Sequence, residues 1–105
     1  MKGIIWQGSS YDDVRAFPEG ARRNTGFQLD KVQRGLDPDD WKPMKSIGSG
    51  VREIRISDVD GSFRIIYVTN IGEFVYVLHA FQKKSQKTRQ RDLRLAKDRY
   101  RAIRR

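Results

Sequence analysis

The sequence predicts an α+β fold, in which helices pack against a small, mostly antiparallel sheet. Three observations support this prediction. Apolar residues recur at helical spacing in residues 21–36, which predicts a helix. Three β-prone runs joined by short turns fill residues 51–80. A last apolar stripe at helical spacing, in residues 93–103, predicts a C-terminal helix. The chain has 105 residues, a length typical of one domain, so we assign residues 1–105 to a single domain.

The N-terminal segment predicts a short strand followed by a helix. Gly3–Trp6 is apolar and β-prone, as expected of a strand. Serine followed three residues later by aspartate occurs twice within residues 9–13, and either pair fits a capping box at a helix start. Pro18 should end this helix, because proline disfavours helical geometry in the preceding residue. Pro18 also suits the first position of a second helix.

The second predicted helix continues to about residue 36. Its buried face would consist of Ala21, Thr25, Leu29, Val32 and Leu36, which keep helical spacing. Gly35 and the Asp37-Pro38 pair then end the helix. Residues 37–50 contain prolines and glycines without periodicity, so we expect a loop that carries Trp41 and Met44 towards the core.

The pattern changes to β-structure at residue 51. The predicted strands are residues 51–57, 62–69 and 73–80, with turns at residues 58–61 and 70–72. A polar stretch, residues 82–87, separates the last strand from a final helix. Its apolar stripe is Leu93, Ala96, Tyr100 and Ile103, and its other faces carry Arg94, Lys97, Arg101, Arg104 and Arg105.

The net charge of +9 is concentrated at one end of the chain. Residues 1–80 carry equal numbers of basic and acidic residues, whereas residues 81–105 carry eleven Lys or Arg against Asp92 and Asp98. A one-sided basic segment favours a polyanion partner, although a solvated basic helix without a partner would have the same composition. The chain contains no cysteine, which excludes disulfides and cysteine-based zinc sites and favours the cytoplasm. No apolar run is long enough for a membrane span, and the N-terminal run is too short for a signal peptide.

Charged residues interrupt the predicted sheet, and alternation places Glu53 and Arg55 on one face. If the turn at residues 58–61 closes a regular hairpin, Arg55 lies opposite Arg64 on the neighbouring strand. If residues 71–72 form a two-residue turn, Arg64 also lies opposite His79 on the last strand. Two opposed arginines repel each other unless an anion lies between them. That anion is either Glu53, in a purely structural salt-bridge cluster, or the phosphate of a nucleic acid.

The available chemistry favours RNA over DNA as a substrate. One histidine and scattered acidic residues offer no convincing metal site, and no nucleotide-binding glycine loop is present, so we expect no metal and no cofactor. RNA supplies its own 2′-hydroxyl as a nucleophile, and the protein then needs only cations and a proton carrier. His79 suits proton transfer, although a lone histidine in a strand is as often a satisfied core residue.

Several stretches resemble one known family. They are residues 5–10 (IWQGSS), 13–18 (DVRAFP), 50–56 (GVREIRI), 60–67 (DGSFRIIY) and 76–85 (YVLHAFQKKS). Together they are similar to the phage-related HigB-like branch of the RelE/ParE toxin superfamily. The resemblance implies a RelE-like microbial RNase-type fold with two N-terminal helices, an antiparallel sheet and a short C-terminal helix. It also implies a partner, the cognate antitoxin, typically of helix-turn-helix type, and cleavage of mRNA in the A site of the 30S ribosomal subunit.

The resemblance also implies roles for individual residues. Arg64 matches the arginine that holds the scissile phosphate, Arg55 matches a basic strand position, and Glu53 would orient Arg55 or accept a proton. Lys83 or Lys84 matches a basic residue after the last strand. Relatives place a catalytic tyrosine or histidine in the C-terminal segment, where this chain offers only Tyr100. This departure favours either His79 as proton carrier or the absence of a true proton carrier. The remaining expected nucleic-acid contacts are Arg52, Gln82, Ser85, Lys87, Arg89 and Arg91.

The sequence therefore predicts a cytoplasmic toxin that acts as a ribosome-dependent, metal-independent mRNA endoribonuclease and inhibits translation. A DNA gyrase inhibitor of the ParE type is one alternative, although those relatives generally lack the basic set at Arg55, Arg64 and Lys83 or Lys84. A non-catalytic nucleic-acid-binding module is another, because the basic C-terminal segment alone would satisfy it. Replacing Arg64 with alanine is expected to abolish the RNase activity and leave the fold intact.

Overall fold

A computed structural model describes residues 1–104 and confirms the α+β class. Arg105, which the sequence assigns to the polar side of the last helix, lies outside the described residues. Five strands form one mixed sheet in the order β1-β5-β4-β3-β2, with β1 parallel to β5 and all other neighbours antiparallel. The strands are β1 (Gly3–Trp6), β2 (Trp41–Pro43), β3 (Val51–Asp58), β4 (Gly61–Val68) and β5 (Phe74–Lys83). The helices are α1 (Ser10–Arg15), α2 (Glu19–Gln33) and α3 (Gln90–Arg104).

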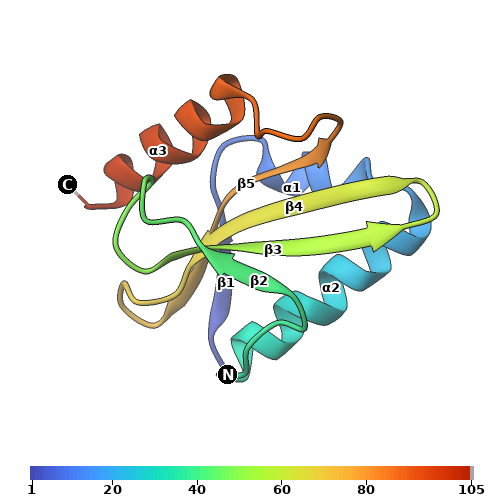
Figure 1. Ribbon diagram of the computed structural model, residues 1–105. Helices are drawn as coiled ribbons and strands as arrows, with labels where there is room; N and C mark the ends of the chain where they lie inside the picture. The colour runs from blue at the N-terminus through green and yellow to red at the C-terminus, as the bar shows by residue number, and fades with distance from the viewer. Residues whose placement is uncertain (105) are drawn as a thin grey trace.

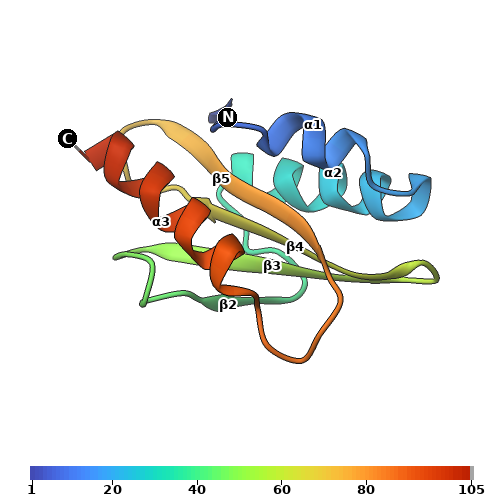
Figure 2. The same ribbon diagram turned by 90° about the horizontal axis from the view of Figure 1, so that it is seen from above.

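The helices cover the two faces of the sheet unequally. α1 and α2 pack on one face, whereas α3 packs on the other, over the end of the sheet near β5 (Figures 1 and 2). The face under α1 and α2 contains the larger apolar cluster, which includes Phe63, Ile65 and Tyr67 of β4. The face under α3 contains a second cluster built around Ile66, Leu78 and Tyr100. The tip of the β3–β4 hairpin extends away from α3, so this part of the second face has no helical cover (Figure 1).

The starts of α1 and α2 differ from the predicted capping. Ser9 is the N-cap of α1, but no side chain caps the helix, because the Ser9 hydroxyl donates to the Asp13 carboxylate instead (2.8 Å). The capping-box prediction is therefore wrong for both serine–aspartate pairs. Pro18 is the N-cap of α2 rather than its first helical residue, and its carbonyl accepts the first intrahelical hydrogen bond from Arg22 (2.8 Å).

The C-terminus of α2 lies earlier than the apolar stripe predicted. Gly35 adopts a left-handed conformation (φ 83°), its N–H donates to Val32, and the Leu36 N–H donates to Lys31. This is a Schellman motif, which a residue without a Cβ atom permits. Leu36 consequently leaves the helix and is 55% exposed, so its predicted place in the buried face is wrong. The other four residues of the stripe are buried as predicted.

The predicted loop at residues 37–50 contains a short edge strand, β2, that the sequence did not reveal. Trp41 pairs with Ile54 and Pro43 with Arg52 of β3. A proline in a three-residue run argues against a strand, but an edge strand tolerates it. Met44 is buried as predicted, whereas Trp41 is half-buried.

The register of the central strands places the charged residues. The predicted pairs Arg55–Arg64 and Ser57–Ser62 both form across the β3–β4 hairpin. The predicted pairing of Arg64 with His79 is wrong, because Arg64 pairs with Phe81 and His79 pairs with Ile66. A longer β4–β5 connection and a bulge next to Ile66 shift the register by two residues, which keeps His79 on the same face but moves it along the strand.

No helix among residues 1–104 is long and apolar enough to cross a lipid bilayer.

Candidate nucleic-acid interface

Arg55 and Arg64 lie directly opposite each other on the sheet face that α3 leaves open. Arg55 is exposed, whereas Arg64 is only 7% exposed. The Nη1 atom of Arg64 donates to the Phe63 carbonyl (3.0 Å), and its Nε atom lies 3.6 Å from Glu53 Oε1. Arg64 is therefore held in one orientation at the sheet surface, while Arg55 remains free to move towards a ligand.

Glu53 is the acidic member of this cluster. Its side chain is buried and lies 4.0 Å from the Nζ atom of Lys42 on the neighbouring strand β2. Neither Glu53 Oε2 nor Arg64 Nε has a hydrogen-bond partner among residues 1–104. The structural salt-bridge interpretation thus applies to Glu53 and Arg64 but not to Arg55, which forms no ion pair with Glu53 in the described part of the chain. One carboxylate faces three cations here, so the cluster retains a positive excess.

A groove of about 480 Å³ opens beside Arg64. It is lined by Ser62 and Arg64 of β4, by Lys83 at the end of β5, and by Lys84, Ser85 and Gln86 of the segment that follows. Lys83 pairs with Ser62 across the strands, which fixes the position of its backbone. The Ser85 hydroxyl donates to the Lys87 carbonyl (2.7 Å) and so shapes the turn that forms the wall. The groove contains cationic and hydroxyl groups and no carboxylate, which suits a phosphate.

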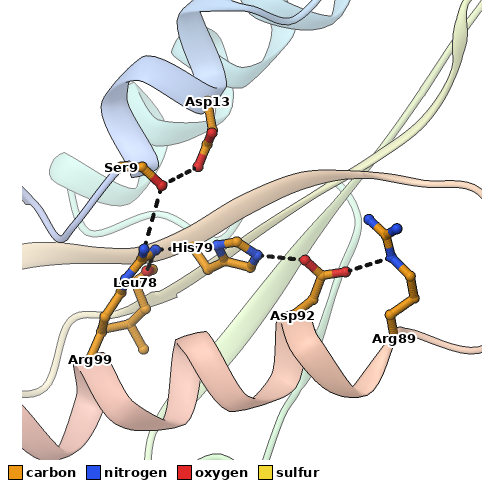
Figure 3. A network of polar contacts seen from close by, with 7 residues as sticks. All are labelled: Ser9, Asp13, Leu78, His79, Arg89, Asp92 and Arg99. Carbon is orange, nitrogen blue, oxygen red and sulfur yellow. Dashed lines mark hydrogen bonds and ion pairs between the residues drawn. The ribbon is translucent and has the colours of Figure 1, made fainter.

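His79, the one histidine of the chain, does not line this groove. It is buried at the centre of a polar network that joins β5 to α3 and to the segment before α1 (Figure 3). Its Nε2 atom lies 2.7 Å from Asp92 Oδ1, and its Nδ1 atom lies 3.3 Å from Arg99 Nη1. The ring also stacks on Phe81, with the ring centroids 5.3 Å apart.

The network fixes the protonation pattern of the imidazole. A guanidinium can only donate hydrogen bonds, so Arg99 requires a lone pair on Nδ1 of His79. The proton of the neutral ring therefore lies on Nε2 and is donated to Asp92. Arg99 also donates to the Leu78 carbonyl (2.9 Å) and the Ser9 hydroxyl (3.4 Å), which ties α3 to two other elements. Both nitrogens of His79 are thus engaged, as expected of a structural histidine.

Asp92 and Arg99 were not identified as site residues from the sequence. Asp92 is one of only two acidic residues in the basic segment 81–105, which is a signal that it has a specific partner. Arg99 is seven residues further along α3, a spacing that returns to the same helix face. The hydrogen bonds of both residues depend on how α3 crosses β5, and this crossing cannot be read from helical periodicity.

The remaining predicted contacts are distributed over the molecule rather than gathered in the groove. Arg52 lies on the opposite sheet face from Arg55, stacks on Trp41 (3.9 Å to the ring centroid) and pairs with Asp37 (3.0 Å). Burial works to lower the pKa of the Arg52 guanidinium, and its contacts with Tyr67 and Asp37 raise that pKa above the ordinary value. Arg52 therefore faces away from the groove and is already paired with Asp37.

The polar residues around α3 frame a second groove. Gln82 donates to the Asp60 carbonyl (3.0 Å), and Arg89 pairs with Asp92 (3.3 Å). Together with Arg91 these side chains line a groove of about 330 Å³ beside His79, whereas Lys87 is exposed in the turn before α3. Among residues 1–104, no group of three or more histidine, aspartate or glutamate side chains could hold a metal ion.

The fold and the groove define a small, basic α+β protein that presents cations on one open face of its sheet. Residues 12–101 match the family model described as phage derived protein Gp49-like (DUF891), and the chain belongs to that family. No curated protein matched the sequence.

Proposed function

We propose that this protein is the toxin of a type II toxin–antitoxin pair, of the RelE/ParE superfamily and its HigB-like branch, and that it cuts messenger RNA without a metal ion. The observation that carries this proposal is the opposition of Arg55 and Arg64 on an open sheet face beside the cationic groove. The sequence resemblance to HigB-like toxins and the membership of a phage-derived family support the same proposal.

The geometry suits a phosphodiester held between the two arginines. Arg64 is oriented by Glu53 and by the Phe63 carbonyl, so its guanidinium need not reorganise when charge develops on the phosphate oxygens. Arg55 is exposed and closes from the neighbouring strand, and Lys83 or Lys84 stabilises the leaving oxygen from the wall of the groove. The 2′-hydroxyl of the RNA attacks the phosphorus and gives its proton to Glu53, while the bond from phosphorus to the 5′-oxygen breaks and that oxygen takes a proton from Lys83 or Lys84.

A non-catalytic RNA-binding module is a second candidate function, favoured by the position of His79. The one histidine is buried away from the groove and has both ring nitrogens engaged. Tyr100, the one tyrosine of the C-terminal segment, donates to the Ser49 carbonyl (3.2 Å) and is also buried. Among residues 1–104 the proton carriers left near the groove are its lysines and Glu53.

Two partners follow from the proposal. The A site of the 30S ribosomal subunit would present the mRNA, with the basic face of α3 against ribosomal RNA. A helix-turn-helix antitoxin encoded beside the toxin would neutralise it. Both partners rest on the family resemblance, and copurification with the product of the adjacent gene tests the second.

The experiment compares induced expression of wild type, Arg55→Ala, Arg64→Lys and Arg23→Ala in bacteria, with mRNA 5′ ends mapped at growth arrest. Arg55→Ala is the preferred loss-of-function variant because Arg55 is exposed, whereas loss of Arg64 removes the buried cation beside the Glu53 carboxylate. Arg23 on α2 is the matched control, since its side chain is 79% exposed and lies on another element.

The proposed RNase requires growth arrest with new cuts inside translated frames for wild type and Arg23→Ala, and loss of both effects for Arg55→Ala. Purified protein that binds RNA with the same Arg55 dependence but never cuts it, with or without translating ribosomes, would support the binding module. Arrest accompanied by DNA breaks and no RNA cuts would contradict both functions and favour a gyrase inhibitor.

A further inference from the structure

A pocket of about 370 Å³ lies on the sheet face covered by α1 and α2, and the proposed RNase function does not use it. It opens where the C-terminal end of α2 meets the start of β3 and the end of β4. Lys2 completes the lining, and its backbone is fixed by two hydrogen bonds to the last residue of α2 (3.0 and 2.8 Å). Tyr67 lines this pocket three positions along β4 from Arg64, so its side chain lies on the opposite face from the proposed RNA site.

The side chain of Tyr67 is fully buried, yet its hydroxyl has no hydrogen-bond partner among residues 1–104. The Arg52 guanidinium lies close enough to lower the pKa of this phenol, but no hydrogen bond of good geometry joins the two groups. Buried polar groups are normally paired with protein atoms, water or a ligand. The unpaired hydroxyl of a residue that lines a pocket therefore indicates that an acceptor binds in that pocket.

Two cations line the same pocket. Lys2 Nζ donates to the carbonyl (2.6 Å) and the hydroxyl (3.0 Å) of Thr69, which uses two of the three N–H groups of the ammonium. Lys2 forms no ion pair within residues 1–104. Arg52 donates to Asp37 through Nη1 (3.0 Å) and carries further N–H donors. Asp37 is the one acidic residue of the lining, so two cations face one carboxylate and the pocket keeps a net positive charge.

We propose that this pocket binds a small organic carboxylate with a short hydrocarbon tail. The carboxylate accepts hydrogen bonds from the Tyr67 hydroxyl, the Lys2 ammonium and the Arg52 guanidinium. Its tail packs against Val32, which is buried, and against Leu36, which the Schellman motif turns out of α2 and leaves 55% exposed. The volume lies near the lower end of the range for small-molecule sites, so the tail is short.

The other possible occupants fit less well. A water molecule would satisfy the Tyr67 hydroxyl but would leave the charge of Lys2 without a counter-ion. An inorganic phosphate would balance that charge but has no apolar part to pack against Val32 and Leu36. A carboxylate with a hydrocarbon tail satisfies the hydroxyl, the cations and the aliphatic wall together.

The test titrates butanoate, 4-methylpentanoate and benzoate, their three neutral amides and inorganic phosphate into ¹⁵N-labelled protein at neutral pH, and follows the backbone amide shifts. Tyr67→Phe and Lys2→Met each remove one proposed donor. Tyr67→Phe nearly conserves the volume of the core, so this variant should fold. Tyr76→Phe and Lys45→Met are the matched controls, because they make the same changes at positions that do not line the pocket.

We expect at least one of the three carboxylates to bind saturably, with a Kd at or below about 1 mM, and to shift the amides of Gly35, Gly50 and Asn70. Its amide should bind at least about tenfold more weakly. Tyr67→Phe and Lys2→Met should each weaken binding of the carboxylate about tenfold, because each removes a hydrogen bond to a charged group, and the two control variants should bind as wild type does.

Three outcomes would overturn the proposal: no saturable binding of any of the carboxylates, equal binding of the amides, or tighter binding of phosphate. Shifts confined to α3, with full binding by Tyr67→Phe, would overturn it as well, because they would mark a general attraction of anions to the basic C-terminal segment. Arg55→Ala should bind the carboxylate as wild type does, so failure of the RNase proposal and failure of this one are distinguishable.

Discussion

Arg64 and Glu53 are buried side by side on the sheet face that α3 leaves open, with Arg64 Nε 3.6 Å from Glu53 Oε1. This distance is too long for a hydrogen bond, and both Glu53 Oε2 and Arg64 Nε lack a hydrogen-bond partner among residues 1–104. The pair is therefore held by electrostatic attraction in a partly desolvated site rather than by tight bidentate bonding. Such a pair contributes little net stability, yet removal of one member leaves a buried charge uncompensated.

We predict that Glu53→Gln and Arg64→Gln each lower the free energy of unfolding by about 3 kcal/mol, because each removes the buried charge that opposes the other, and only the half-exposed Lys42 remains near Glu53. The double variant should lose less than the sum, with a coupling energy of about 1–3 kcal/mol. Urea denaturation of the four proteins measures this cycle. Additive losses would show that the two side chains act independently despite their proximity.

The network around His79 gives a prediction about its tautomer. Arg99 donates to Nδ1 and Asp92 accepts from Nε2, so the neutral ring should carry its proton on Nε2. Long-range ¹H–¹⁵N correlation spectra distinguish the two tautomers directly. Arg99→Met should remove this constraint and cost about 1–3 kcal/mol of stability, since the Leu78 carbonyl also loses its donor. Detection of the Nδ1–H tautomer in wild type would contradict the assigned network.

Local patterns predicted much of this fold. The alternation of Glu53 and Arg55 and the compact turn at residues 58–61 were sufficient to place Arg55 opposite Arg64, because a short hairpin leaves few possible registers. The apolar stripe on α3 was also recognisable, and Ala96 and Tyr100 are buried within it. In both cases the determining interactions lie between residues that are close in sequence.

The errors concern interactions that a local pattern does not encode. A longer β4–β5 connection and a bulge next to Ile66 moved His79 away from Arg64, and nothing in an apolar run marks where a bulge will form. The docking of α3 decided that Asp92 and Arg99 bind His79, so both ring nitrogens of this candidate proton carrier have partners that the sequence did not indicate. Candidate site residues on β3 and β4 were therefore easier to place than those that depend on the crossing of α3 over β5.

Two glycines of the α2 segment should respond to substitution in opposite directions. Gly26 lies inside α2, and a Cβ atom there meets nothing, so Gly26→Ala should stabilise the protein by about 1 kcal/mol through helix propensity. Gly35 has a φ of 83° in the Schellman motif, so Gly35→Ala should destabilise by about 1 kcal/mol. Thermal unfolding of both variants checks the signs, and stabilisation by Gly35→Ala would contradict the observed end of α2.

Stability at alkaline pH should depend on Tyr67. Its side chain is fully buried, its hydroxyl has no hydrogen-bond partner with good geometry within residues 1–104, and burial raises the pKa of the phenol more than the nearby Arg52 guanidinium lowers it. A phenol with a raised pKa in the folded state contributes stability below its ordinary pKa of about 10, and this contribution is lost as the pH rises through the folded-state value. Tyr67→Phe should therefore unfold less readily than wild type above about pH 10.

The same substitution separates the ionisation of the phenol from its packing. At neutral pH, Tyr67→Phe should equal wild type or exceed it by up to about 1 kcal/mol, because the lost hydroxyl made no hydrogen bond. Urea denaturation at neutral and alkaline pH measures both effects, with Tyr76→Phe as a control for a half-buried tyrosine of the same sheet. A constant difference between Tyr67→Phe and wild type at both pH values would mean that ionisation of Tyr67 does not limit alkaline stability. A variant that is more stable only at high pH would confirm that the buried phenol opposes its own ionisation.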